Sequence, residues 1–131
     1  MTYGALNQYK QNTVYTATPE ELTLMLYDGC VKFMNIAKYS IENKDITKAH
    51  EALIRAQDII TELKTTLDTS YEISSSLIKL YDFVIDRLID ANIKKDIKSI
   101  DEALEIVTEL RDTWKEAMKQ VKKKIYSNRS V

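Results

Sequence analysis

Hydrophobic residues recur every three or four positions along most of this chain, which is the spacing of amphipathic helices. The clearest case is residues 46–67, where the steps between apolar positions alternate between three and four, as in the seam of a helical bundle. These positions are Ile46, Ala49, Leu53, Ala56, Ile60, Leu63 and Leu67. Apolar stripes of the same kind run through residues 22–37, 73–91 and 100–125. The pattern predicts four long helices.

Polar residues mark where the first two helices begin. In Thr18-Pro19-Glu20-Glu21, the threonine can cap a helix, the proline suits the first helical position and Glu21 completes a capping box. This helix is expected to run to about Asn43, and Asp45 is expected to start the next one.

The third and fourth helices have similar start signals. Thr69 is followed three residues later by Glu72, which predicts a second capping box and a third helix reaching about Asn92. The fourth helix is predicted to open at Asp96 or at Ser99, and the sequence leaves both starts open.

The predicted lengths and loops favour one architecture. Helices of roughly 22–28 residues would be roughly 33–42 Å long, and short loops between helices of similar length place neighbours antiparallel. We therefore predict an all-α protein, an antiparallel up-down four-helix bundle with an N-terminal arm. The arm is expected at residues 1–17, the bundle at 18–126 and a C-terminal tail at 127–131.

Two predicted helices carry more apolar surface than one bundle seam needs. The first helix is apolar on one side at Leu22, Met25, Leu26, Gly29, Phe33, Ile36 and Ala37, and on the opposite side at Leu24, Tyr27, Val31 and Met34. The third helix has a second stripe at Ile78, Tyr81, Ile85 and Ile89. Uneven packing within the bundle could cover these second stripes. We favour a groove for an amphipathic partner helix, because large exposed apolar patches usually mark interfaces.

The arm is also unusual in composition. Residues 1–18 contain a single charged side chain, Lys10, although a solvated tail would be more highly charged. Their apolar and aromatic residues include Tyr3, Leu6, Tyr9, Val14 and Tyr15. We expect the arm to dock on the bundle, with a frayed terminus as the alternative.

Composition and charge exclude several classes of function. The 131 residues have a net charge of −1, which does not favour nucleic-acid binding, and two glycines and one proline argue against a glycine-rich phosphate loop. Residues 115–131 hold six basic side chains and one Glu, which suits a helix C-terminus or, alternatively, an acidic docking partner. Without a signal-peptide pattern or a long apolar run, we expect a cytoplasmic protein that does not insert into membranes.

Candidate catalytic residues are few. A carboxylate-bridged metal site needs Glu three residues before His, but Thr47 stands in that position before His50. A histidine phosphotransfer bundle would place Lys and Gly where this chain has Leu53 and Ile54. Cys30 is expected to be a small buried apolar residue. We therefore predict no enzyme activity and no cofactor.

One long string and three shorter ones carry a family resemblance. The string NTVYTATPEELTLMLYDG at residues 12–29 resembles the signature of the flagellin-specific export chaperones, the FliS family. The stretches AQDIITEL (56–63), LY (80–81) with RLIDAN (87–92), and ELRDTW (109–114) agree with it. The resemblance implies a non-enzymatic bacterial chaperone whose partners are the C-terminal region of flagellin and a component of the flagellar export gate. It further implies that the chaperone prevents premature polymerisation and assists delivery of its client.

The resemblance and the second apolar stripes together give the predicted partner-binding residues. They are Tyr9, Asn12, Val14, Leu24, Tyr27, Val31, Met34, Ile78, Tyr81, Ile85, Ile89 and Asn92. We expect a monomer or weak homodimer. The alternative functions are a histidine phosphotransfer bundle and a plain structural helical oligomer.

Overall fold

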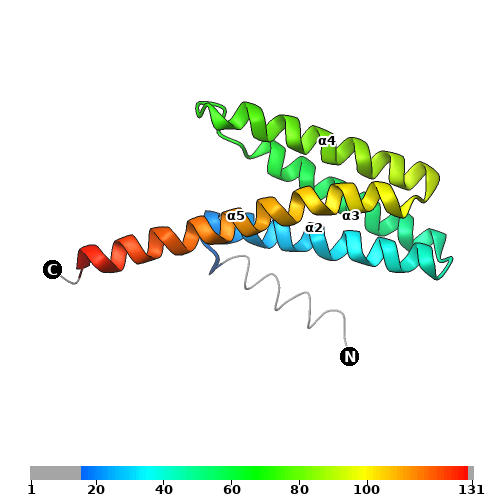
Figure 1. Cartoon of the computed structure of the whole chain (residues 1–131), viewed down its shortest axis with the longest axis horizontal. Helices are drawn as coiled ribbons and strands as arrows, with labels where there is room; N and C mark the ends of the chain where they lie inside the picture. The colour runs from blue at the N-terminus through cyan, green and yellow to red at the C-terminus, as the bar shows by residue number, and fades with distance from the viewer. Residues whose placement is uncertain (1–15, 130–131) are drawn as a thin grey trace.

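The computed structural model describes residues 16–129, which form a bundle of antiparallel helices (Figure 1). The elements are α2 (Pro19–Glu42), α3 (Ile46–Thr65), α4 (Ile73–Lys94) and α5 (Ile97–Arg129). Within this part of the chain the secondary structure is helical, which confirms the predicted all-α up-down architecture. Residues 1–15 of the predicted arm lie outside the described residues.

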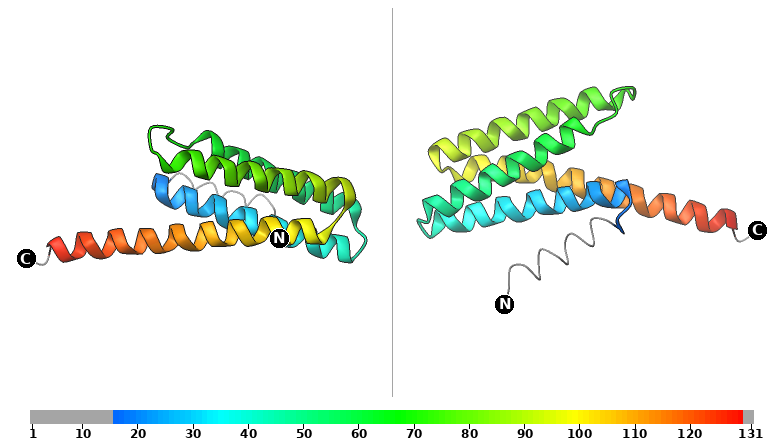
Figure 2. Two further views of the ribbon diagram at one scale, coloured as in Figure 1. Left: turned by 45° about the horizontal axis from the view of Figure 1, so that its top comes forward. Right: turned by 180° about the vertical axis from the view of Figure 1, so that it is seen from behind.

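The four helices are arranged as a square in cross-section. Each helix packs against the helix before and after it in the chain, and α5 closes the square by packing against α2 (Figures 1 and 2). The core between them contains large side chains at Met34, Leu53, Ile60, Tyr81, Leu88 and Ile100. Alanines fill the places where helices approach closely, including Ala37, Ala49, Ala52, Ala56, Ala91 and Ala103.

The first two predicted caps are confirmed. The Thr18 side-chain oxygen accepts a hydrogen bond from the Glu21 backbone N–H at 3.1 Å, and Pro19 occupies the first position of α2. The Asp45 carboxylate accepts one from the Lys48 backbone N–H, also at 3.1 Å. Both bonds satisfy an N–H group that a helix start leaves without a partner inside the helix.

The capping box predicted before α4 is wrong. Glu72 has helical backbone angles, and α4 starts without a side-chain cap. Asp68 organises this loop instead, since its carboxylate accepts hydrogen bonds from the Ser70 N–H at 2.9 Å and the Ser70 hydroxyl at 2.6 Å. These two bonds stabilise the ionised carboxylate and lower the pKa of Asp68.

The start of α5 is at the first of the two predicted positions. The Asp96 carboxylate accepts hydrogen bonds from the Lys98 N–H at 3.0 Å and the Ser99 hydroxyl at 3.1 Å, and Ile97 opens the helix. At 33 residues, α5 is longer than the expected range and continues through Arg129, so the predicted tail boundary at residue 127 lies inside a helix. Its C-terminal part projects beyond the other helices (Figure 1).

Candidate partner-binding grooves

An open apolar hollow of about 800 Å³ lies along α2 and the C-terminal end of α3. Its lining comprises Pro19, Leu22, Thr23, Met25, Leu26, Asp28, Gly29, Lys32 and Phe33 from α2, with Glu62 and Thr66 at the end of α3. The apolar members are half-buried, apart from the exposed Pro19, so they remain accessible from solvent. We call this hollow the α2–α3 groove.

Gly29 lies in the middle of the α2–α3 groove, where α2 passes α3. A Cβ atom added at this position would lie 3.4 Å from Cδ1 of Ile59, at the edge of ordinary contact. A methyl group therefore fits, but a larger side chain would enter the hollow or displace Ile59. The absence of a side chain at Gly29 keeps the groove open at its centre.

Phe33 ends the α2–α3 groove and is flanked by two cations. The Lys32 Nζ atom lies 5.9 Å from the centroid of its ring, and the Arg55 Cζ atom lies 5.7 Å from it. Asp28 and Glu62 add negative charges to the rim. A floor of apolar side chains with a rim of mixed charge is suited to an amphipathic helix, whose apolar face would lie on the floor.

A second apolar hollow, of about 450 Å³, lies between the start of α2 and the projecting part of α5. It is lined by Thr18, Glu20, Glu21, Trp114, Ala117, Met118, Val121, Lys122 and Ile125. The Trp114 Nε1–H donates a hydrogen bond to the Glu20 carbonyl at 2.9 Å, which ties the two helices together. We call this hollow the α2–α5 groove, and the first turn of α2 separates it from the α2–α3 groove.

Three of the predicted partner-binding residues are core residues. Tyr27 is 4% exposed, Met34 0% and Tyr81 2%. The hydroxyl groups of Tyr27 and Tyr81 are hydrogen-bonded at 2.6 Å between α2 and α4. Burial raises the pKa of both tyrosines. The expectation that these side chains lie on a free surface is therefore wrong.

Neighbouring helices half-cover most of the remaining predicted stripe on α2. Leu24 and Val31 are half-buried and share a seven-residue spacing with Lys38, so all three lie on one side of the helix. Lys38 forms an ion pair with Asp101 of α5 at 2.6 Å, which identifies that side as the one facing α5. In a square bundle each helix has two neighbours, and this second neighbour accounts for the second stripe.

The predicted stripe on α4 is explained in the same way. Ile78 and Ile85 are half-buried and lie seven residues apart, in line with Asn92. The Asn92 Nδ2–H donates to Nδ1 of His50 on α3 at 2.9 Å, so this side of α4 faces α3. Ile89 is 38% exposed and is the most accessible of the predicted residues in the described part of the chain. Tyr9, Asn12 and Val14 lie outside the described residues.

The two apolar stripes on α2 thus differ from expectation. Neighbouring helices cover the stripe that was expected to bind a partner, and part of the other stripe lines the open groove. The open groove is lined by Leu22, Met25, Leu26 and Phe33, which are outside the predicted binding set. The signal that could have found them is Gly29, because a glycine inside an apolar stripe of a helix marks a place without packed side-chain volume.

The candidate chemistry of Cys30 and His50 is limited. Cys30 is completely buried, as predicted, and desolvation raises the pKa of its thiol to about 12, so it is un-ionised at neutral pH. The Nδ1 atom of His50 is engaged with Asn92, whose Oδ1 atom accepts from Lys95 at 2.6 Å. Among residues 16–129 there is no group of three potential metal ligands, and no helix there is long and apolar enough to cross a membrane.

Comparison with known proteins gives the family. A family model described as "Flagellar protein FliS" matches residues 2–121. The chain belongs to the FliS family. A flagellar secretion chaperone FliS from Bacillus subtilis is 49% identical over 115 residues, covering 88% of this chain and 86% of the relative. The FliS chaperone of Salmonella typhimurium is 36% identical over 80 residues, 59% of each chain.

A solved structure supports the fold of this FliS-family chain. A crystal structure of a flagellar chaperone from bacteria superposes with a TM-score of 0.73 and covers 89% of this chain and 97% of that chain. Its sequence identity is 23%, so it bears on the fold alone. Family membership confirms the predicted resemblance and the role of a chaperone in flagellar export.

Proposed function

We propose that this FliS-family chaperone binds the C-terminal segment of flagellin in the cytoplasm, prevents its premature polymerisation and passes it to the flagellar export gate. The observation that carries the proposal is the α2–α3 groove, an apolar hollow of about 800 Å³ with a charged rim. Its lining on α2 runs from Pro19 to Phe33, about 21 Å at 1.5 Å per residue. That length accommodates roughly four turns of a partner helix.

Burial of apolar surface supplies the driving force in this proposal. A client segment that is disordered alone must lose conformational entropy when it folds against the chaperone. Each Å² of apolar surface removed from water contributes about 25 cal/mol, which offsets this ordering cost. Binding and release of this kind need no nucleotide, because a competing partner at the export gate can take over the client.

The α2–α5 groove offers the client a second contact. The two grooves flank the first turn of α2, so one chain leaving the α2–α3 groove can continue past Pro19 toward Met118 and Val121. The accessible members of the predicted set on α4, above all Ile89, would be reached by a client that wraps further round the bundle.

The test is calorimetric titration of a flagellin C-terminal peptide into the wild type and the Met25→Glu variant. Met25 is half-buried in the groove, and a carboxylate there would have to be desolvated when the client binds. We expect binding at least about tenfold weaker, equivalent to about 1.4 kcal/mol, with similar circular dichroism and a similar free energy of unfolding.

Tyr39→Glu is the matched control. Tyr39 also lies on α2 and is 65% exposed, but it lines neither groove. We expect its affinity for the peptide to equal that of the wild type. Unchanged affinity of Met25→Glu would contradict the α2–α3 groove as the binding site, and weaker binding by Ile89→Asp would extend the site to α4.

A further inference from the structure

The part of α5 that projects beyond the other helices is strongly basic (Figure 1). Residues 115–128 contain a single acidic side chain, Glu116, whose carboxylate accepts a hydrogen bond from Gln120 at 3.0 Å. The same stretch has five lysines, which are Lys115, Lys119, Lys122, Lys123 and Lys124. All five are exposed, and none forms an ion pair within residues 16–129. The chain as a whole has a net charge of −1, so this positive charge is a local feature of the helix end.

An apolar strip runs between these lysines. Its members Val121 and Ile125 are 59% and 49% exposed, and because they are four residues apart they lie side by side on the helix surface. At about 100° per residue, Lys122 lies on one side of the strip and Lys124 on the other, while Glu116 is on the opposite face of the helix. An exposed apolar strip flanked by lysines is the pattern of a helix that lies at the interface between water and a lipid bilayer.

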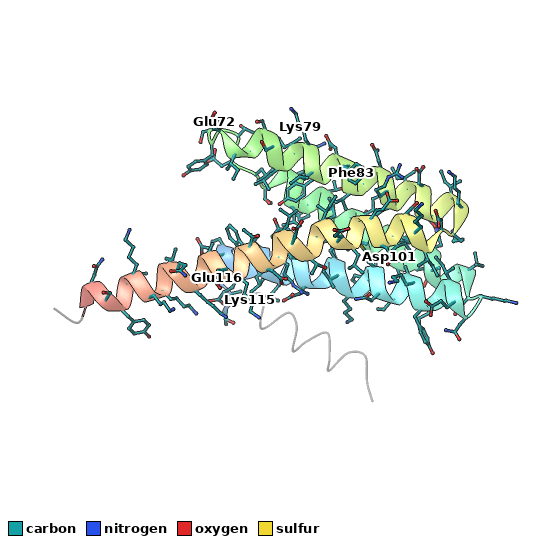
Figure 3. All side chains as sticks on the ribbon, in the orientation of Figure 1. Glu72, Lys79, Phe83, Asp101, Lys115 and Glu116 are labelled. Carbon is teal, nitrogen blue, oxygen red and sulfur yellow. The ribbon has the colours of Figure 1, made fainter. Side chains whose placement is uncertain are left out.

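The strip is accessible because α5 extends past the bundle. Lys115 and Glu116 lie where the helix leaves the bundle (Figure 3). Val121 and Ile125 lie about 10 and 16 Å further along the axis than Trp114, which is bonded to the start of α2. Both also line the α2–α5 groove, so a lipid surface and the second contact proposed for the client would exclude each other there.

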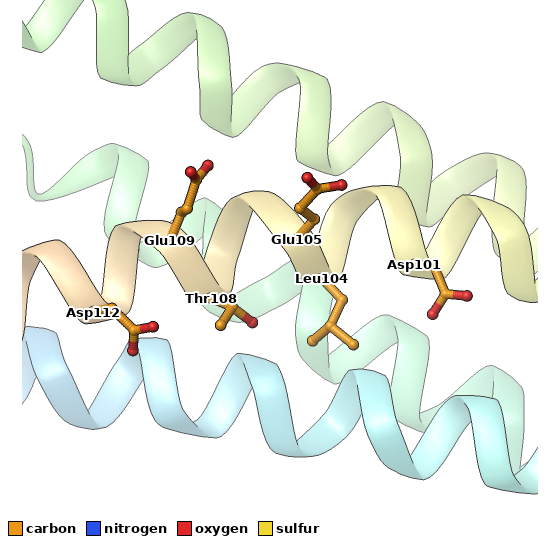
Figure 4. A pocket seen from close by; sticks show the side chains of 6 residues that line it. All are labelled: Asp101, Leu104, Glu105, Thr108, Glu109 and Asp112. Atoms are coloured by element: carbon orange, nitrogen blue, oxygen red, sulfur yellow. The ribbon is translucent and has the colours of Figure 1, made fainter.

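The first half of α5 has the opposite charge. A shallow hollow of about 430 Å³ is lined by Asp101, Leu104, Glu105, Thr108, Glu109 and Asp112 (Figure 4). Figure 4 shows Glu105 and Glu109 on one side of this hollow, toward α4, and Asp112 on the other, toward α2. Within residues 16–129, neither Glu105 nor Glu109 forms an ion pair. An anionic surface would be repelled by this half of the helix, so it can approach only the projecting part.

We propose that the projecting part of α5 docks this protein on the surface of membranes that contain anionic lipids. The lysines would lie among the lipid headgroups, and Val121 and Ile125 would enter the boundary between headgroups and acyl chains. The helix would lie on the bilayer without crossing it, and the acidic half would keep the bundle away from the surface. A lipid surface suits this helix better than a soluble polyanion such as a nucleic acid, because a polyanion leaves the apolar strip in water.

Cosedimentation with vesicles tests the proposal. One set of vesicles is phosphatidylcholine alone, and the other is phosphatidylcholine mixed with phosphatidylglycerol. We expect the full-length protein to bind the anionic vesicles in preference to the neutral ones and to be released as salt is added. Lys119→Gln/Lys124→Gln removes one lysine from each side of the strip and should weaken binding roughly thirtyfold, about fivefold for each lysine. Val121→Gln/Ile125→Gln should weaken it at least about tenfold, because less apolar surface leaves the water.

Lys48→Gln/Lys79→Gln is the matched control. It makes the same change of net charge as the lysine variant, at exposed positions of α3 and α4, and Figure 3 shows Lys79 on α4, away from the projecting helix. We expect this control to bind anionic vesicles like the wild type. Circular dichroism verifies the fold of each variant, and if a double variant loses helicity, Lys124→Gln or Ile125→Gln alone replaces it.

Three results would overturn the proposal. They are a wild type that does not bind anionic vesicles at low salt, equal binding by Lys119→Gln/Lys124→Gln and the control, and unchanged binding by Val121→Gln/Ile125→Gln. The last result would indicate a site for a soluble polyanion instead of a lipid surface. The Met25→Glu titration tests the α2–α3 groove separately, because none of these substitutions lies in that groove.

Discussion

At the scale of single residues, the hydrogen-bonded hydroxyls of Tyr27 and Tyr81 show why a sequence does not distinguish a second apolar stripe that is buried from one that is exposed. Both side chains lie outside the main apolar seam of their helices, yet each is almost completely buried. Their hydrogen bond at 2.6 Å satisfies two polar atoms that would otherwise destabilise the core. This pairing across 54 residues of sequence links α2 to α4.

A double-mutant cycle tests the contribution of this pair. Tyr81→Phe should lower the free energy of unfolding by about 1–2 kcal/mol, because it leaves the buried Tyr27 hydroxyl without its partner. The double variant Tyr27→Phe/Tyr81→Phe should lose less unfolding free energy than the two single variants together, since neither hydroxyl is then left without a partner. Urea unfolding monitored by circular dichroism measures all four proteins, and strictly additive losses would contradict the coupling.

Cys30 should make stability depend on alkaline pH. Its folded pKa of about 12 lies above the value of about 8.5 for a free thiol. The unfolded chain therefore loses this proton first, and the stability present below about pH 8.5 declines as pH rises, by up to about 1.4 kcal/mol per pH unit. In Cys30→Ala the decline between about pH 9 and 10 should be shallower. Parallel curves of unfolding free energy against pH would contradict this account.

At the scale of helices, the caps show which sequence signals are realised. Thr18 and Asp45 accept backbone hydrogen bonds at the starts of α2 and α3, whereas α4 has no side-chain cap. The capping box predicted at Thr69 does not form, because the Asp68 carboxylate accepts two hydrogen bonds from Ser70 and holds these residues in a turn. A local motif is realised only when the preceding loop leaves its residues in the right backbone conformation.

Alanine substitutions distinguish the caps. Thr18→Ala and Asp45→Ala should each lower the free energy of unfolding by about 1 kcal/mol, because each leaves a helix N–H without its bond. Thr69→Ala is the matched control and should change stability by less than about 0.5 kcal/mol. Urea unfolding gives the three values, and an equal loss at Thr69 would mean that the capping box forms after all.

At the scale of the whole molecule, α5 has two parts with different roles. Its first half packs into the square and contributes Ile100, Ala103 and Val107 to the core. Between Lys115 and Asn128 the side chains are exposed except for the half-buried Met118. The projecting part therefore provides surface, in the α2–α5 groove and on its basic side, rather than core.

Truncation of the chain after Met118 tests this division. We expect the truncated protein to keep its helical bundle and to lose less than about 1 kcal/mol of unfolding free energy, since the side chains at residues 119–128 are all exposed. Thermal unfolding followed by circular dichroism measures this effect. Loss of cooperative unfolding would show that the projecting part belongs to the core.

Much of the fold followed from local patterns. The seam at residues 46–67 predicted α3, the string from Thr18 to Glu21 predicted the start of α2, and short loops predicted antiparallel neighbours. The motif at residues 12–29 predicted the family. These features could be predicted because helix formation and capping depend on residues a few positions apart.

The candidate site depended on tertiary structure. The sequence places Leu22 and Met25 on one side of α2 and Tyr27 and Met34 on the other, but periodicity gives directions only about the helix's own axis. Which side is buried depends on where α3, α4 and α5 lie and how far each extends along α2. The sequence by itself therefore determined the helices, their order and the family of the protein. The packing of the helices decided that the side of α2 with Met25 remains accessible to solvent and that the side with Tyr27 is buried.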